Sequence, residues 1–182
     1  MKTGEIIKTF TAKDGRKVIL RTPKWEDLDD FLEAINSLVD EGADILRTQK
    51  VSREEEIEWL SHVLSHMERG EMLYVVGEVD GKVVGLSEMS RRSGRESHVG
   101  VLGIAIRQGF REVGLGTEMM KTLVERAPQM GLKVLLLSTF ATNERAFHVY
   151  KKVGFVETGR IPRRFFKDGG YVDEIILTKV LE

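Results

Sequence analysis

The segment spanning residues 98–120 constrains the fold of this chain most strongly. Residues 98–106 are almost entirely apolar, which predicts a strand buried in the middle of a sheet. Gly114 and Gly116 follow, and an apolar face at helical spacing begins between them. That face consists of Leu115, Met119, Met120, Leu123 and Val124. A buried strand, a glycine-containing turn and an amphipathic helix in this order indicate an α/β protein.

The rest of the chain shows the same mixture of elements. Strands are predicted at residues 18–21, 72–79, 82–89, 98–106, 134–140, 155–159 and 171–181, with turns at residues 14–15, 80–81 and 168–170. Helices are predicted at residues 25–39, from the capping box of Ser52 and Glu55 to Gly70, from the glycines to Pro128, and at residues 143–153. Residues 40–50 are predicted to form a loop. The sequence therefore predicts a mixed α/β sheet in one domain.

The composition excludes several classes of protein. A chain of 182 residues with 41% hydrophobic and 31% charged residues is typical of one soluble globular domain. Its net charge of −1 predicts no general attraction to nucleic acid or to an anionic membrane. No apolar run is long enough to span a bilayer, and the first residues lack a signal core, so we expect a cytoplasmic protein. The absence of cysteine excludes disulfides, thiolate metal sites and a cysteine nucleophile.

The turn between the central strand and its helix has the properties of an anion site. A helix N-terminus presents unpaired backbone N–H groups and the positive end of the helix dipole. Gly114 and Gly116 allow a large anion to approach that backbone closely, and Arg111 offers a charge-assisted hydrogen bond. The prediction is a phosphate or pyrophosphate site. The same residues also fit a plain strand-to-helix turn with a surface arginine.

Known phosphate-binding loops narrow this choice. No lysine follows Gly116, so the turn is not a P-loop, and Met119 stands where a dinucleotide-binding loop has its third glycine. The turn reads R-x-x-G-x-G from Arg111 to Gly116. This pattern resembles the pyrophosphate loop of the Gcn5-related N-acetyltransferase (GNAT) family, which joins a central strand to a helix.

A second motif resembles the same family. Residues 143–155 read N-x-x-A-x-x-x-Y-x-x-x-G-F, as in the family's next helix. Asn143, Ala146 and Tyr150 are three and four residues apart and share one helical face. Asn143 suits the start of a helix and Gly154 suits its end. The resemblance covers residues 17–181.

The resemblance implies both a fold and an activity. The implied fold is a mixed, mostly antiparallel central sheet of about seven strands flanked by about four helices, with residues 1–182 forming a single domain. The implied reaction transfers an acetyl group from acetyl-CoA to a primary amine by direct attack in a ternary complex. The acceptor would be a small amine, an amino acid or a protein N-terminus. We expect no metal, and the resemblance leaves a homodimer open.

The resemblance also implies roles for individual residues. The backbone of Ile104, Ala105 and Ile106 would bind the pantetheine arm of the cosubstrate, with Asn143 and Ala146 beside it. Tyr150 would act as the general acid that protonates the departing thiolate. The pyrophosphate would lie on the backbone of Arg111, Glu112, Val113, Gly114, Leu115, Gly116 and Thr117. The carboxylate of Glu112 is unusual there, because it costs affinity for an anion unless it points away or is paired. Four further cations either contact phosphate or belong to a solvated face: Arg107, Arg145, Lys151 and Lys152.

The general base is less well defined by the sequence. Family members place a glutamate at positions that correspond to about Gly100 and to Ser138, and neither residue is acidic here. The remaining candidates are Glu88 on the preceding strand and His98 at the start of the central strand. Proton loss through ordered water is the third alternative.

The acceptor and two rival functions stay open at this point. The resemblance places the acceptor between residues 25–69 and 161–171. Carboxylates on the first two helices favour a cationic acceptor or form a solvated face, whereas Arg163 and Arg164 favour a carboxylate-bearing acceptor. These carboxylates are Asp27, Asp29, Asp30, Glu33, Glu54, Glu55, Glu56 and Glu58. The missing strand glutamates also fit a noncatalytic acyl-CoA-binding regulatory module. A nucleotide-binding protein is the third alternative, and the missing P-loop lysine argues against it.

Overall fold

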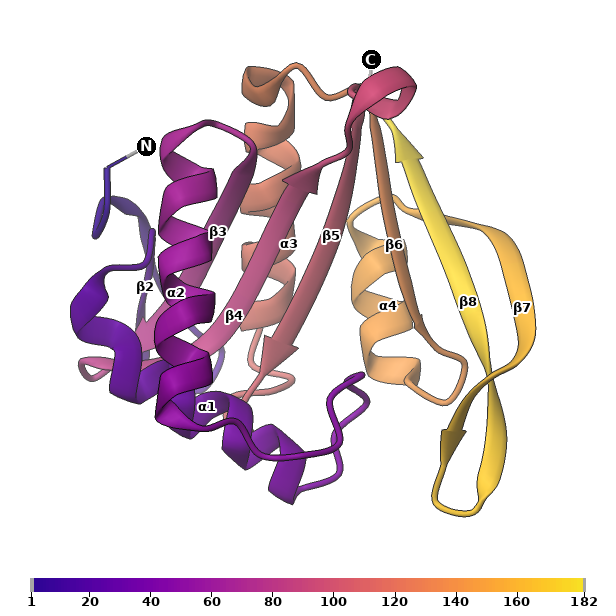
Figure 1. Ribbon diagram of the computed structural model, residues 1–182, viewed down its shortest axis with the longest axis horizontal. Helices are drawn as coiled ribbons and strands as arrows, with labels where there is room; N and C mark the ends of the chain where they lie inside the picture. Colours follow the sequence, from indigo (N-terminus) through magenta and orange to yellow (C-terminus); the bar gives the residue numbers. More distant parts are fainter. Residues whose placement is uncertain (1, 182) are drawn as a thin grey trace.

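Strands form the middle layer of the protein, and helices cover both of its faces (Figure 1). This computed structural model describes residues 2–181, so the ends of the predicted domain, residues 1 and 182, lie outside the described part. The strands are β1 Ile6–Thr11, β2 Lys17–Arg21, β3 Met72–Val79, β4 Lys82–Arg91, β5 Val99–Ile106, β6 Val134–Phe140, β7 Val156–Lys167 and β8 Gly170–Val180. The α-helices are α1 Leu28–Asp40, α2 Arg53–Glu68, α3 Leu115–Arg126 and α4 Glu144–Lys152. Single 3₁₀ turns occur at Trp25–Asp27, Gly94–Glu96 and Ala127–Met130.

The strand order creates an opening in the sheet. Within residues 2–181 the eight strands lie in the order β1-β2-β3-β4-β5-β6-β8-β7, and β5 and β6 form the one parallel pair. That pair is short, because Val99–Val101 alone align with Val134–Leu136. Beyond these residues β5 and β6 diverge, as Figure 1 shows. The last residues of β5 therefore have free backbone groups on the β6 side.

The predicted fold class is confirmed, with one strand more than expected. The additional strand, β1, pairs with β2 across the predicted turn at residues 14–15. Four of its six residues are exposed and the other two are half-buried, so its sequence lacks the apolar run that marks a buried strand. The sheet accordingly begins before residue 17, where the family resemblance begins. The final hairpin is also longer than predicted, because exposed residues extend β7 to Lys167.

Two separate cores fix the helices on the sheet. On one face, Met119, Met120 and Leu123 of α3 are fully buried. Gly85 permits this close packing, since a Cβ atom there would lie 2.7 Å from the sulfur of Met119. On the other face, Phe31 of α1 packs with α2 and β3. Neither core closes the gap between β5 and β6 beyond Val101 and Leu136, where the two strands diverge.

A buried ion pair joins the first elements of the chain. The guanidinium of Arg21 on β2 donates two 2.7 Å hydrogen bonds to the carboxylate of Asp27 and one of 2.6 Å to Glu78 on β3. Arg21 and Asp27 are 5% and 3% exposed, so solvent screens their attraction little.

None of the helices in residues 2–181 has both the length and the hydropathy needed to cross a membrane.

Candidate active site

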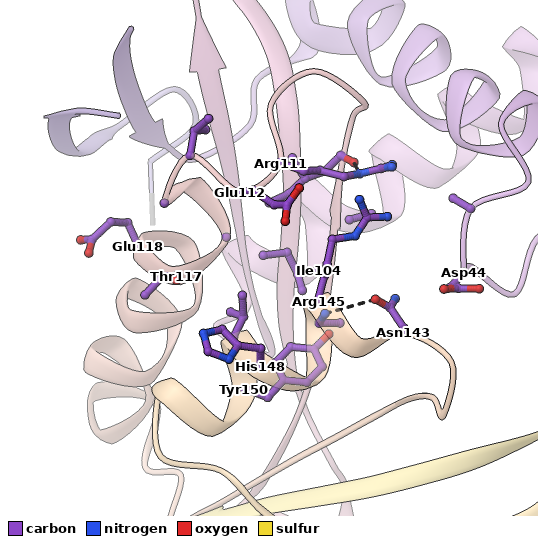
Figure 2. A pocket seen from close by; sticks show the side chains of 18 of the residues that line it. Asp44, Ile104, Arg111, Glu112, Thr117, Glu118, Asn143, Arg145, His148 and Tyr150 are labelled. Carbon is purple, nitrogen blue, oxygen red and sulfur yellow. Dashed lines mark hydrogen bonds between the residues drawn. The ribbon is translucent and has the colours of Figure 1, made fainter. Parts of the chain in front are cut away.

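A cleft of about 970 Å³ opens where β5 and β6 diverge (Figure 2). Its walls come from the end of β5, the start of α3 and the helix α4. Strand β1 and the loop at residues 41–45 complete the rim. Twelve of the thirteen predicted cofactor-binding residues line it: Ile104, Ala105, Ile106, Arg111, Glu112, Val113, Gly114, Gly116, Thr117, Asn143, Ala146 and Tyr150. The exception, Leu115, is 1% exposed and belongs to the core.

The loop before α3 presents a row of free backbone donors to this cleft. Glu112 and Gly114 have positive φ angles of 63° and 94°, and Gly114 is the N-cap of α3. None of the backbone N–H groups of residues 111–117 donates a hydrogen bond to an acceptor within residues 2–181. Alternating left-handed residues turn successive N–H groups toward one side, and the dipole of α3 adds positive potential. The loop therefore has the form of an anion-binding nest.

The side chain of Arg111 supports the loop. Its Nε–H donates a 2.8 Å hydrogen bond to the carbonyl of Ile106 at the end of β5. Its terminal nitrogen contacts the carboxylate of Glu41 in the loop after α1. The guanidinium thus ties the glycine loop to β5 and to the rim, rather than standing free for an anion.

The structure explains the backbone conformation of Glu112 but not its carboxylate. A left-handed φ angle is uncommon outside glycine and costs about 1 kcal/mol or more. It is required here to begin the nest that Gly114 completes. The Glu112 carboxylate lines the cleft, and nothing in the structure explains why a carboxylate is present there.

Helix α4 directs the second motif into the same cleft. The side-chain oxygen of Asn143 accepts a 3.1 Å hydrogen bond from the backbone N–H of Ala146 and caps the helix. Tyr150 lies one helical turn after Ala146 and is 5% exposed. Its ring packs edge-on against the ring of Phe155, with the two centroids 6.4 Å apart. Burial raises the pKa of Tyr150 to about 12, so the phenol keeps its proton at neutral pH.

The Tyr150 hydroxyl group is free to act in the cleft. It has no hydrogen-bond partner in residues 2–181. Among these residues, however, no side-chain N or O atom is both buried and unpartnered. The hydroxyl oxygen must therefore contact solvent, and the residue lines the cleft (Figure 2). A protonated, unengaged phenol is available to donate to a bound group.

The cleft has more cations than its own carboxylates neutralise. Lys8 and Lys121 are paired with Glu118, and Lys167 is paired with Asp44. Arg111 is paired with Glu41. Three lining cations have no ion-pair partner among the described residues, namely Lys13, Arg145 and Lys152, and neither have the two lining carboxylates Glu112 and Glu144. These three side chains come from the turn after β1 and from α4, on either side of the glycine loop. The end of the cleft near that loop is therefore suited to several phosphate charges.

Comparison with known proteins identifies the family. The family model "Acetyltransferase (GNAT) family" matches residues 32–155, more than half of the chain. The chain belongs to the GNAT family. It is an acetyltransferase by this membership, and the family predicted from its two motifs is confirmed.

Its relatives include acetyltransferases with different stated acceptors. The chain is 27% identical to YwnH of Bacillus subtilis, provisionally named a phosphinothricin acetyltransferase, over 89% of this chain and 98% of that protein. It is 30% identical to the L-amino acid N-acetyltransferase AaaT of Escherichia coli over 58% of this chain and 67% of that protein. A phosphinothricin acetyltransferase of Sinorhizobium meliloti, solved with acetyl-CoA, superposes with a TM-score of 0.80 at 20% identity, covering 90% of this chain and 88% of that one.

The two candidate bases of this GNAT protein lie in different places. Glu88 on β4 is opposite Gly103 of β5, and its carboxylate oxygen lies 3.6 Å from the place of a Cβ atom at Gly103. Burial raises the pKa of Glu88 above its ordinary value. His98 is exposed just before β5, at the end of the sheet remote from Ile106. Neither Glu88 nor His98 lines the cleft. The structure thus brings Glu88, and not His98, to the middle of the central strand.

Sequence reasoning missed the first strand and the rim of the site. Lys8 and Lys13 lie on or beside β1, and the backbone N–H of Lys13 donates a 2.9 Å hydrogen bond to the carbonyl of Val113. The guanidinium of Arg16 lies 4.3 Å from the ring centroid of Phe110 and so also holds the glycine loop. The turn at residues 14–15, which calls for a hairpin partner before β2, was the available signal. Asp44 and Glu41 lie in a segment that had been predicted only as a loop.

Proposed function

We propose that this protein transfers the acetyl group of acetyl-CoA to a primary amine by direct attack in a ternary complex. The observation that carries the proposal is the meeting of two motifs, some thirty residues apart, in one cleft. One motif offers unpartnered N–H groups for a pyrophosphate, and the other offers an unengaged phenol. Some of the named relatives are acetyltransferases of amines, which supports the same reaction.

The cleft fits acetyl-CoA in shape and charge. Its volume of about 970 Å³ is that of a large ligand site. The nest at residues 111–117 would hold the pyrophosphate, and Lys13, Arg145 and Lys152 would meet the remaining phosphate charge. The free backbone edge of Ile104–Ile106, left by the divergence of β6, would pair with the amide groups of the pantetheine arm. When bound, the cosubstrate supplies a thioester at the divergence of the two strands.

Two residues would move the protons of the reaction. Glu88 accepts the proton that the acceptor ammonium must lose before its nitrogen becomes a nucleophile. As the new C–N bond forms and the C–S bond breaks, the Tyr150 hydroxyl donates its proton toward the sulfur. A backbone N–H of β5 stabilises the oxyanion that develops between these steps. Glu88 is preferred to His98 as the base because it lies beside Gly103, whereas His98 lies at the far end of β5.

Replacement of Tyr150 tests the proposed function. In an assay of thiol release from acetyl-CoA across a panel of amines, we expect Tyr150→Phe to lower kcat about 100-fold or more, because general acids contribute rate factors of this size. The KM for acetyl-CoA should change little, since the ring and its packing remain. Tyr171→Phe is the matched control, because Tyr171 is 68% exposed on the last hairpin and does not line the cleft.

The same assay, together with equilibrium binding of CoA and ATP, separates the rival functions. Tight CoA binding with no turnover of any amine would favour a noncatalytic acyl-CoA-binding module. Preference for ATP over CoA in equilibrium binding would favour a nucleotide-binding protein. Full activity of Tyr150→Phe across the pH range would show that the phenol is not the acid.

A further inference from the structure

A second group of unpartnered polar side chains lies on the opposite face of the sheet from α3, under α1 and α2. It consists of Glu56, Tyr74 and Glu88. Tyr74 and Glu88 are directly opposite each other on β3 and β4, and Glu88 is opposite Gly103 on β5. Side chains that face each other across a ladder project on the same side of a sheet. Tyr74, Glu88 and Gly103 therefore form a row across the sheet that ends at β5, the strand beside which the thioester of the cosubstrate would lie.

Glu56 reaches the same region from α2. It belongs to the sheet-facing stripe of that helix together with Leu60, Val63 and Met67, and it is 5% exposed. Within residues 2–181 no cation lies within ion-pair distance of it, and no donor hydrogen-bonds to its carboxylate. Burial raises the pKa of Glu56 to about 7, and the more distant Arg47 offsets only part of that effect. A desolvated carboxylate of this kind gains most from a cationic ligand.

Tyr74 links the two carboxylates. It is opposite Glu88 on β4, and it packs in one cluster with Leu60, Val63 and Met67, the residues of α2 that share the buried stripe of Glu56. Burial raises the pKa of Tyr74 well above its ordinary value, and the negative charges of Glu88 and Glu56 raise it further. Tyr74 is 5% exposed and packs edge-on against Trp59 and Phe31, with ring centroids 5.4 Å and 5.9 Å apart. These aromatic rings supply an apolar wall beside the three polar groups.

The oxygens of these polar groups are not completely enclosed by protein. Neither the Tyr74 hydroxyl nor the carboxylates of Glu56 and Glu88 has a hydrogen-bond partner among the described residues. No side-chain N or O atom in that part of the chain is both buried and unpartnered, so their oxygens all contact solvent. Nearly buried groups that are unpartnered yet accessible are suited to a ligand that supplies the missing hydrogen bonds and charge.

We propose that the acceptor is an amine carrying a second cationic group, as an α,ω-diamine does, and that Glu56 and Tyr74 bind that second cation. The inference rests on the proposed function, in which Glu88 takes the proton of the reacting ammonium. One carboxylate then serves each cationic end of the acceptor. The reacting nitrogen forms the C–N bond while the C–S bond breaks, and the second ammonium keeps its protons and donates a hydrogen bond to the Glu56 carboxylate.

The charges around this region disfavour a carboxylate-bearing acceptor. A free α-carboxylate would meet two unpaired carboxylates in a poorly screened site. The hairpin arginines that would favour such an acceptor are engaged elsewhere. Arg164 lies 3.5 Å from Glu174, and the Arg163 guanidinium lies 6.0 Å from the ring centroid of Tyr171. Arg47 is the nearby cation that remains as a partner for an acidic group.

A set of acceptors matched in length tests the proposal. We would measure kcat/KM with 1,4-diaminobutane, butylamine and 4-aminobutyrate. The diamine is expected to be the best acceptor and the amino acid the poorest. Glu56→Gln should lower kcat/KM for the diamine at least about tenfold more than for butylamine, because it removes the counter-charge of the second ammonium. Glu58→Gln, an exposed position on the same helix, is the control and should match the wild type with every acceptor.

Calorimetry separates this inference from the proposed function. Binding of 1,4-diaminobutane to the CoA-loaded protein should weaken at least about tenfold in Glu56→Gln, whether or not turnover occurs. If the diamine binds in a Glu56-dependent way but is not acetylated, the proposed reaction is wrong and the proposed diamine-binding site is supported. Three results would overturn the diamine site: equal effects of Glu56→Gln on diamine and monoamine, no binding of the diamine, or a preference for 4-aminobutyrate. A preference for 4-aminobutyrate would indicate that Arg47 binds the carboxylate of the acceptor.

Discussion

At the scale of single residues, the site depends on groups whose partners are missing from the protein itself. Tyr150, Tyr74, Glu56 and Glu88 are largely buried, yet none has a hydrogen-bond partner within residues 2–181. Because their oxygens still contact solvent, a ligand that enters the site can supply the hydrogen bonds that the protein does not. Arg111 shows the opposite case, since its donors are used within the fold.

The pH dependence of the rate tests Glu88. A base must be ionised, and burial raises the pKa of this carboxylate, so kcat/KM should fall as the pH drops through a value above the ordinary 4.5. Glu88→Gln should lower kcat/KM about 100-fold and remove this acidic limb. Glu96→Gln, an exposed glutamate before β5, is the control. An acidic limb that persists unchanged in Glu88→Gln would assign the proton transfer to water or another group.

At the scale of elements, short-range contacts fix where each helix and strand begins. Ser52 and Glu55 form the predicted capping box at the start of α2, with hydrogen bonds of 3.2 Å and 2.8 Å. Asn143 caps α4 in the same way. The first strands need more, because β1 is largely exposed and β2 is short. The buried pair of Arg21 and Asp27 ties β2 to the turn before α1.

Removal of the Asp27 carboxylate should destabilise the protein strongly. Asp27→Ala is expected to lower the free energy of unfolding by about 3 kcal/mol, because the buried guanidinium of Arg21 loses a bidentate partner. Asp29→Ala should lower it by less than about 1 kcal/mol, because its pair with Arg53 is exposed. Urea unfolding curves of the two variants give the comparison. Similar losses for both would mean that Glu78 alone neutralises Arg21.

At the scale of the whole molecule, the cleft is closed by contacts between distant parts of the chain. Glu41 and Asp44, in the loop after α1, pair with Arg111 of the glycine loop and Lys167 of the last hairpin. The stacked rings of Phe140 and Phe165, with centroids 3.9 Å apart, hold that hairpin against β6. One sheet runs through all these parts of residues 2–181. We therefore propose that the chain forms a single domain.

Thermal unfolding tests this proposal. The protein should unfold in one cooperative transition, because the sheet is continuous from β1 to β7. Acetyl-CoA at 100 times its Kd should add about 2.7 kcal/mol and raise Tm by about 5–10 °C as a single step. Calorimetry with and without the cosubstrate measures both quantities. Two resolved transitions, of which acetyl-CoA moves one, would show separate domains.

The sequence by itself determined the family and most element positions, and it predicted twelve of the residues that line the cleft. It could do so because these features depend on local spacing. A buried strand, two glycines and a helical face encode the nest, and residues 143, 146 and 150 share a face of any helix that contains them. Even the class of the cosubstrate followed from the family resemblance that the two short motifs carry.

Only the tertiary structure decided which side chains of distant segments meet. Edge strand β1 was missed because its exposed residues carry no burial pattern, although Lys8 and Lys13 reach the cleft. Glu88 and His98 were equal candidates until the register of β4 on β5 placed one beside Gly103 and left the other at the far end. Glu56 was one carboxylate among many until α2 packed on the sheet and buried it near Tyr74. Burial and pairing arise from long-range packing, so a local pattern does not contain them.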